Sequence, residues 1–333
     1  MRVEVELGTF NSTSAARWVD RILGRVEDGW HIWWLVDAEH LEDTAWWRLA
    51  RPALQQLARA AARAVLRWQD DAGSAPGGSV HTRTVRVAEG ALGPGEWQKA
   101  HLCLAPEPAC RFLDEHLRVL VENREADGAF LAIVIERLGS PELRELVRLS
   151  PPPLTYDSLG GSGQMVDDID TRVREAKAQS RPARLLVVID SDARWPGDRR
   201  APPSNIKAAC DRAAVPCHVL RKRCADNYLP GELLGVVVEA TRRRFVRAVC
   251  ALSRELHDHF PLAKGLAGVK ENTERQRYAA LDETTRHALD QGLGRAVKSA
   301  WSTHGDGVTA GALEQRDGRG ELREITALIA SWL

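Results

Sequence analysis

The most constraining feature of the sequence is a short apolar run that ends at two acidic residues. Residues 185–189 read Leu-Leu-Val-Val-Ile, and Asp190-Ser191-Asp192 follows directly. An uninterrupted apolar run of this length is typical of a parallel strand that is covered on both faces. In open α/β sheets, ligands bind beyond the carboxyl ends of the strands. The run therefore predicts a buried strand that delivers two carboxylates to a ligand-binding edge.

The spacing of Asp190 and Asp192 predicts a cation site. Their side chains are expected to point to the same side of the extended chain, because side chains alternate with period two. Two neighbouring carboxylates repel each other unless a cation lies between them. Hard, oxygen-preferring Mg²⁺ or Mn²⁺ is the natural occupant. The same three residues could instead form a turn or cap a helix, so this spacing alone leaves both interpretations open.

Other stretches repeat this pattern of an apolar strand followed by a polar turn. Residues 118–121 form a short strand that ends at Glu122, and a helical pattern begins at residue 128. Residues 218–230 form a further strand that continues into a basic and then an acidic turn. Between these strands lies a glycine-rich loop whose backbone amides could receive phosphate. Its glycines are Gly160, Gly161 and Gly163.

The succession of strands and turns over residues 113–232 resembles the TOPRIM domain. Within that superfamily it is most similar to the nucleases of the OLD (overcoming lysogenization defect) family and to related bacterial phage-defence proteins. The resemblance is carried by the strand ending at Glu122, by Asp190-Ser191-Asp192, and by Asp226-Asn227-Tyr228, where similar domains often have Glu-Asn-Tyr. It implies a Rossmann-like, mostly parallel sheet.

The resemblance also implies roles for single residues. Glu122 would be an acid/base or metal-binding carboxylate, and Asp190 with Asp192 would hold Mg²⁺ or Mn²⁺. We place Asp127 in the same metal-binding set and Asp226 in a secondary acidic turn. The segment that ends at Lys264 is similar to one in which such nucleases place a functional lysine.

One departure from the family pattern follows Glu122. The family usually has glycine there, whereas this chain has Asn123. Asparagine is the residue besides glycine that most readily accepts a positive φ, so the turn is expected to survive.

The chain is long enough for about two domains of ~150 residues. Residues 1–112 contain seven of the eleven tryptophans within their first 70 residues. We predict a tryptophan-rich α+β domain there, with the rings in its core; stacking on unpaired bases is the alternative. The TOPRIM domain would span 113–232, and residues 233–333 would be helical. The predicted fold class is thus α/β, with an N-terminal α+β domain and a helical C-terminal region.

Charge constrains how such a protein could bind nucleic acid. The formal net charge is zero, so binding would need locally clustered basic residues. The candidates are a loop arginine after the acidic pair, a basic turn, and one helix face, any of which could instead be a solvated surface. They are Arg194; Arg221, Lys222 and Arg223; and Arg242, Arg243, Arg244 and Arg247.

These features together predict a divalent-metal-dependent nuclease that cleaves DNA or RNA as part of a bacterial anti-phage system. The sequence has no Walker-type phosphate loop, so we expect a separate AAA- or ABC-type ATPase, or another defence-system subunit, as partner. Oligomers are possible. Two alternatives stay open: a non-catalytic TOPRIM subunit that binds nucleic acid or a partner, and a haloacid-dehalogenase-type phosphatase, which also uses Asp-x-Asp.

The sequence also bears on location. It shows no signal peptide, and no apolar stretch approaches the ~20 residues of a membrane span. We therefore expect a cytoplasmic protein that does not enter the membrane. The six cysteines do not follow a zinc-binding spacing, so we expect reduced thiols.

Overall fold

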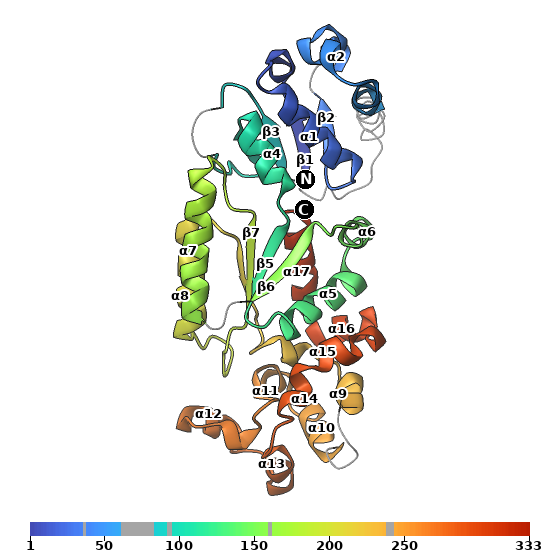
Figure 1. Ribbon diagram of the computed structural model, residues 1–333. Coiled ribbons are helices and arrows are strands. Elements are labelled where there is room, and N and C mark those ends of the chain that lie inside the picture. The colour runs from blue at the N-terminus through green and yellow to red at the C-terminus, as the bar shows by residue number, and fades with distance from the viewer. Residues whose placement is uncertain (36–37, 61–82, 92–94, 159–161, 238–242) are drawn as a thin grey trace.

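The computed structural model describes residues 1–35, 38–60, 83–91, 95–158, 162–237 and 243–333 (Figure 1). Its strands form two four-stranded parallel sheets, so the protein is α/β, as predicted. No helix among these residues is both long and apolar enough to cross a membrane.

The first sheet lies in the N-terminal region and has the strand order β2-β1-β3-β4. Its elements are β1 (Arg2–Val5), α1 (Ala16–Glu27), β2 (Ile32–Leu35), α2 (Ala45–Leu49), β3 (Thr84–Val87), β4 (His101–Leu104) and α4 (Pro106–Asp114). Every pair is parallel, which corrects the prediction of an α+β domain. Short alternating strands fit either pairing, but the crossovers between them, such as the one containing α1, are long enough to join parallel strands.

Three of the N-terminal tryptophans lie fully in this domain's core, whereas Trp18 is half-buried beside Arg17 and Arg21. Trp30, Trp33 and Trp46 are each about 2% exposed. The Phe10 ring lies 5.3 Å from the ring of Trp46 and 6.1 Å from that of Trp33, both edge to face. Rings buried in this way are not available to stack on bases, so the core interpretation holds for these three. The side chains of Trp34 and Trp68 lie outside the described residues.

The second sheet has the strand order β6-β5-β7-β8 and is also entirely parallel. Its elements are β5 (Leu117–Val121), α5 (Ala126–Leu138), α6 (Pro141–Val147), β6 (Leu154–Ser158), α7 (Ser162–Ala178), β7 (Leu185–Ile189), α8 (Ala201–Ala213) and β8 (Cys217–Val219). Both sheets therefore place their strands in the same relative order. A Rossmann-like architecture fits this topology.

The apolar run of β7 is buried on both faces, as its sequence predicts. Leu185, Val187 and Ile189 pack into a core shared with α7 and α8. Leu186 and Val188 belong to the main core, which includes side chains of α5 and α17 (Glu321–Ala330). Figure 1 shows α7 and α8 on one side of the sheet and α5 and α17 on the other.

The connections of this sheet diverge at its centre. The crossover after β5 contains α5, and the crossover after β7 contains α8, on the opposite face. Because β5 and β7 are adjacent, their carboxyl ends lie at the topological switch point, where open α/β sheets bind ligands.

The C-terminal region is helical, as predicted. It contains η3 (Ala225–Tyr228), α9 (Gly231–Val237), α10 (Arg243–Cys250), α11 (Arg254–His259), α12 (Asn272–Arg277), α13 (Glu283–Leu289), α14 (Arg295–Lys298), α15 (Ala300–His304) and α16 (Ala310–Asp317) before α17. Most of these helices gather beyond the carboxyl edge of the second sheet, whereas α17 returns beside α5 (Figure 1). The Trp301 ring of α15 lies 5.1 Å from the Phe130 ring of α5, which joins the helical region to the sheet.

Candidate active site

The carboxyl ends of β5 and β7 meet, as their matching sequence pattern predicts. The two strands are parallel neighbours, with Leu120 paired to Val187. Glu122 and Asp190 each stand one residue beyond their strand, at the same edge of the sheet. The charge of Glu122 helps to raise the pKa of Asp190, so the acids predicted from two distant stretches lie close together.

A cavity of about 250 Å³ opens at this point. Four of its lining residues are carboxylates that come from the ends of β5 and β7, the start of α5 and the turn after β8. A single lysine reaches it from α14. The lining residues are Glu122, Asn123, Ala126, Asp127, Asp190, Cys224, Ala225, Asp226 and Lys298.

The turn after Glu122 is held by reciprocal hydrogen bonds. Asn123 Oδ1 accepts from the amides of Glu125 and Ala126 at 3.0 and 3.2 Å, which caps the start of α5. In return, Asp127 Oδ2 accepts from the amide of Asn123 at 2.8 Å. Asn123 does not have a positive φ, so the expected glycine-like role is wrong here. Asn123 instead holds the turn by accepting the amides that lead into α5.

The turn after β7 separates the two aspartates. Asp190 Oδ1 accepts the amide of Ala225 at 3.0 Å, which ties it to the next strand's turn. Asp192 has a φ of 52° and is exposed, and it is not among the residues that line the cavity. The left-handed φ of Asp192 ends the extended conformation on which the period-two argument depends, so that argument does not apply to its side chain. Its charge still acts on the site, since it raises the pKa of Glu122.

The carboxylates of the cavity destabilise one another's ionised forms. Glu122 is exposed at the rim of the cavity, and partial desolvation there, followed by the charges of Asp192 and Asp127, raises its pKa to about 7. Burial and the charge of Asp127 raise the pKa of Asp226 to about 7. Burial, with the charges of Asp127 and Glu122, holds the pKa of Asp190 well above its ordinary value. Burial raises the pKa of Asp127 itself to about 6. The cavity thus holds more negative charge than its own residues neutralise.

Lys298 is the functional candidate that sequence reasoning missed. Its charge lowers the pKa of Glu122, Asp127 and Asp226, against the larger effects that raise them. No strand end or recognisable motif precedes it, and only the tertiary fold brings it to the acids. Lys264, which the sequence favoured, is exposed and does not line the cavity.

The loop that carries Lys264 nevertheless supports the segment that carries Lys298. Leu293 and Gly294 donate backbone hydrogen bonds to Leu262 and Ala263 at 2.8 and 2.9 Å. A Cβ on Gly265 would lie 2.4 Å from the backbone nitrogen of Gly292, so the two loops cross with no room for a side chain. This crossing fixes the start of α14.

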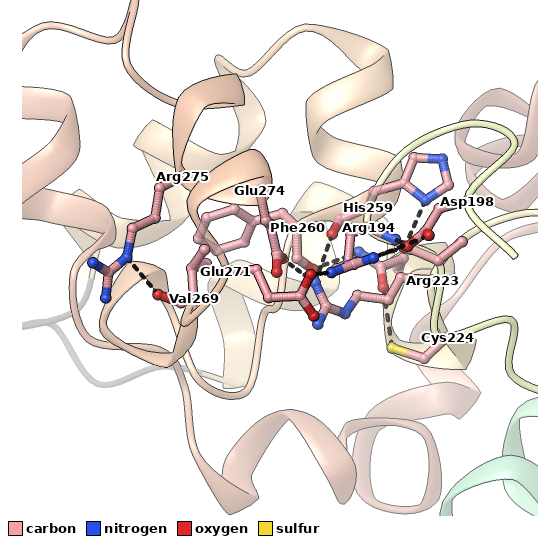
Figure 2. A network of polar contacts seen from close by, with 12 residues as sticks. Arg194, Asp198, Arg223, Cys224, His259, Phe260, Val269, Glu271, Glu274 and Arg275 are labelled. Atoms are coloured by element: carbon pink, nitrogen blue, oxygen red, sulfur yellow. Dashed lines mark hydrogen bonds and ion pairs between the residues drawn. The ribbon is translucent and has the colours of Figure 1, made fainter. Parts of the chain in front are cut away.

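The loop arginine proposed to bind phosphate is held inside the protein. Figure 2 shows Arg194 bound to Asp198, at 2.7 and 3.1 Å, and to Glu271. His259 Nδ1 forms a hydrogen bond with the backbone oxygen of Ala193 at 3.0 Å. Arg194 therefore anchors the loop after the acidic pair to the helical region.

The basic turn after β8 is also neutralised by internal partners. Arg221 pairs with Glu324 at 2.5 Å, Lys222 with Asp258 at 2.9 Å, and Arg223 with Glu274 at 2.7 Å. Lys222 is 3% exposed. Instead of forming an open electrostatic track, these cations hold the carboxyl edge of the sheet against the surrounding helices.

The other predicted phosphate ligands do not reach the cavity. Gly163 is exposed near the start of α7 and is not among the lining residues. Arg243 is exposed on α10. Gly160, Gly161 and Arg242 lie outside the described residues.

The chemistry of the cavity fits Mg²⁺ or Mn²⁺ in its donor atoms, because hard cations prefer carboxylate oxygens. Within the described residues, however, no group of three or more His, Cys, Asp or Glu side chains is arranged to hold a metal ion. Mg²⁺ usually keeps several waters and binds one or two carboxylates together with substrate phosphate. The cavity can meet that requirement without a complete protein cage.

Comparisons with known proteins give no family for the chain. No protein-family model matches it, and neither does any curated protein or solved structure. The resemblance to TOPRIM nucleases is therefore carried by the sequence motifs and stays a prediction; the sheet topology is compatible with a Rossmann-like fold.

Proposed function

We propose that this protein is a TOPRIM-type nuclease that hydrolyses phosphodiester bonds of nucleic acid with Mg²⁺ or Mn²⁺. One observation carries the proposal: four carboxylates and one lysine from separate segments line a single cavity at the switch point of the second sheet. The raised pKa values of Glu122, Asp190 and Asp226 support a cation there, because a cation would relieve their repulsion.

In this proposal Asp190 and Asp226 hold the cation, with Asp127 beside them. When bound, a divalent cation would supply an activated water and neutralise charge on the scissile phosphate. Glu122, whose pKa is about 7, is suited to accept a proton from that water near neutral pH. Lys298 would stabilise negative charge that develops on the phosphate oxygens.

The proposal extends to partners through the family resemblance. Proteins of the OLD type pair their nuclease domain with an ATPase, and this sequence contains no Walker-type loop. We therefore propose a separate ATPase or another anti-phage subunit as partner. The proposal covers DNA and RNA alike, because the cavity residues contact a phosphodiester group common to both.

A cleavage assay tests the proposal. The purified chain, alone and with the products of its neighbouring genes, is incubated with single- and double-stranded DNA and RNA in Mg²⁺, Mn²⁺ or excess chelator. We expect cleavage only with metal and its loss in Asp190→Asn. The matched control is Asp167→Asn, an exposed aspartate of α7 outside the cavity. Cleavage in chelator, or full activity of Asp190→Asn, would overturn the proposal.

The second candidate is a non-catalytic subunit that binds nucleic acid. It is favoured by the finding that the described residues contain no ready-made three-ligand metal group. A protein of this kind would bind nucleic acid but would not cleave it under any metal condition. Asp190→Asn would then have no cleavage to remove, and nucleic-acid binding would persist in the variant.

A further inference from the structure

A second and much larger cavity lies in the helical C-terminal region. It is an open groove of about 1250 Å³ between α10 on one side and α12 and α13 on the other, with residues 266–269 at its base. In Figure 1 these helices lie at the end of the molecule opposite the N-terminal sheet. None of the cavity carboxylates lines this groove, so the two sites are distinct.

Basic side chains from three helices line the groove. Arg244 and Arg247 come from α10, Arg275 from α12 and Arg286 from α13. Glu283 and Asp290 also line it, so the arginines outnumber the acids. His287 adds a further group that becomes positive when protonated.

These arginines differ from those of the sheet edge in having no internal counter-charge. Within the described part of the chain, Arg244, Arg247 and Arg286 form no ion pair with any acid. Arg275 donates Nε to the backbone oxygen of Val269 at 2.8 Å, as Figure 2 shows, and this contact leaves its charge uncompensated. Arg194, Arg221 and Arg223, by contrast, each face a carboxylate. Unpaired arginines on facing walls indicate an anionic ligand.

We infer that this groove binds the phosphodiester backbone of a nucleic acid. Arg244 and Arg247 are three residues apart on α10 and face the same side of that helix. The hydroxyl of Thr284 on the opposite wall adds a donor of the kind that binds phosphate oxygens, whereas Thr285 Oγ1 already donates to Asp282 at 2.6 Å. The volume exceeds the roughly 300–1,000 Å³ of small-ligand pockets, and the groove is open, which favours a strand over a single nucleotide.

The groove is mechanically linked to the carboxylate cavity. Residues 283–298 form its α13 wall and continue through Gly292 and Gly294 to Lys298. Ala267, at the base of the groove, donates a backbone hydrogen bond to Asp290 at 2.9 Å. The crossing of these two loops therefore fixes both the groove wall and the cavity lysine. The inference rests on the proposed function only for the claim that the bound strand is the substrate.

Binding in excess chelator tests the inference without any cleavage. Fluorescence anisotropy of labelled DNA and RNA oligonucleotides is measured across a salt series for the wild type and for the triple variant Arg244→Gln/Arg247→Gln/Arg286→Gln. We expect binding to weaken at least tenfold and the slope of log affinity against log salt to flatten by about 2–3, because each neutralised phosphate contributes about 0.7–0.9. Unchanged affinity and slope would overturn the inference.

The matched control is Arg174→Gln/Lys177→Gln/Arg212→Gln. It removes the same number of charges from exposed positions on α7 and α8. We expect it to bind as the wild type does; an equal loss would show that only net charge matters and would overturn the inference. The variant Arg244→Lys/Arg247→Lys/Arg286→Lys should retain most of the salt slope, whereas a misfolded groove would not.

Competitors identify the class of ligand. Unlabelled oligonucleotide should displace the probe far better than a mononucleotide or poly-glutamate at equal charge concentration. Equal competition by the mononucleotide would make the groove a small-ligand site, and equal competition by poly-glutamate would make it a general anion surface; either result overturns the inference.

A small substrate separates this inference from the proposed function. Hydrolysis of bis(p-nitrophenyl) phosphate needs the carboxylate cavity but not the groove, so the triple arginine variant should retain it. If the wild type shows no hydrolysis but the groove variants lose nucleic-acid binding, the proposed function fails and the groove assignment stands. If hydrolysis is metal-dependent but the groove variants bind nucleic acid as the wild type does, the groove assignment fails and the proposed function stands.

Discussion

Glu122 and Asp190 line one cavity at the ends of β5 and β7, the two central strands of the second sheet. These residues are 68 positions apart in the chain, yet each is the first residue after its strand. Parallel pairing places both strand ends at the same edge. Their charges lie together at the switch point, where the charge of Glu122 helps to raise the pKa of Asp190.

Removing one of these charges should stabilise the metal-free protein above neutral pH. The folded-state pKa of Asp226 is about 7, raised from its ordinary value near 4, so the folded state binds more protons than the unfolded state between these values. Stability contributed by this group therefore falls as pH rises through that window. Asp226→Asn should raise the unfolding free energy by roughly 1–2 kcal/mol at pH 8, after allowance for solvent screening, with little gain at pH 4.

Chemical denaturation of both proteins at the two pH values, with chelator present, measures this difference. Glu125→Gln is the control, because Glu125 is exposed and does not line the cavity. A variant that is less stable at pH 8 than the wild type would contradict the charge argument.

Lys298 and Lys264 should differ in their effect on cleavage. Lys298→Ala should reduce kcat by about 10²-fold or more, because it removes a charge next to the reacting phosphate. The acid limb of the pH profile should also move upward, since Lys298 lowers the pKa of Glu122. Lys264→Ala should stay within a few-fold of the wild type. Equal losses in both variants would place the functional lysine elsewhere.

The crossing of the two glycine loops should be intolerant of side chains. A Cβ on Gly292 would lie 2.4 Å from the nitrogen of Gly265 and 2.5 Å from the backbone of Ala263. Gly292→Val should therefore displace α14 and lower both thermal stability and cleavage. Gly311→Ala is the control, because a Cβ at Gly311 meets nothing within 4 Å. A Gly292→Val protein with wild-type melting temperature and activity would show that the loops do not cross as described.

Arg223 should prove to be a stabilising residue without a role in substrate binding. Its partner Glu274 has a side chain only 5% exposed, so Arg223→Ala leaves a carboxylate buried without its counter-charge. We expect a loss of about 3 kcal/mol in unfolding free energy. The salt dependence of nucleic-acid binding should not change. A flattened salt slope with unchanged stability would restore Arg223 as a phosphate ligand.

The sequence contained enough information for the second sheet and for the four carboxylates that line its cavity, Glu122, Asp127, Asp190 and Asp226, although not for Lys298. The uninterrupted apolar run of residues 185–189 predicted β7, because both faces of that strand are buried. The acidic residue that follows each central strand identified Glu122 and Asp190. The conformation of Asp192 could not be predicted from the sequence. Its positive φ is held by tertiary hydrogen bonds from Ser191 and Asp192 to the turn at Lys222 and Arg223.

The roles of charged residues were harder to predict from the sequence than the positions of apolar strands were. Arg221, Lys222 and Arg223 look like a phosphate-binding cluster in sequence, but their acidic partners lie far along the chain and only the fold brings them together. Lys298 was missed because nothing near it in the sequence marks it. Its importance comes only from acids that precede it by many residues and that the fold brings to it. Parallel pairing of the first sheet was missed because short alternating strands do not specify a direction.

The central claim, that the carboxylates of the cavity beyond β5, β7 and β8 form one divalent-cation site, is tested most directly by Mn²⁺ titration of the metal-free protein at pH 8, followed by electron paramagnetic resonance. This measurement needs neither substrate nor partner. We predict saturable binding that is lost in Asp190→Asn and kept in Asp167→Asn, with affinity falling as pH decreases below 7 because the ligands become protonated. Absence of binding in the wild type, or equal binding by Asp190→Asn, would contradict the account.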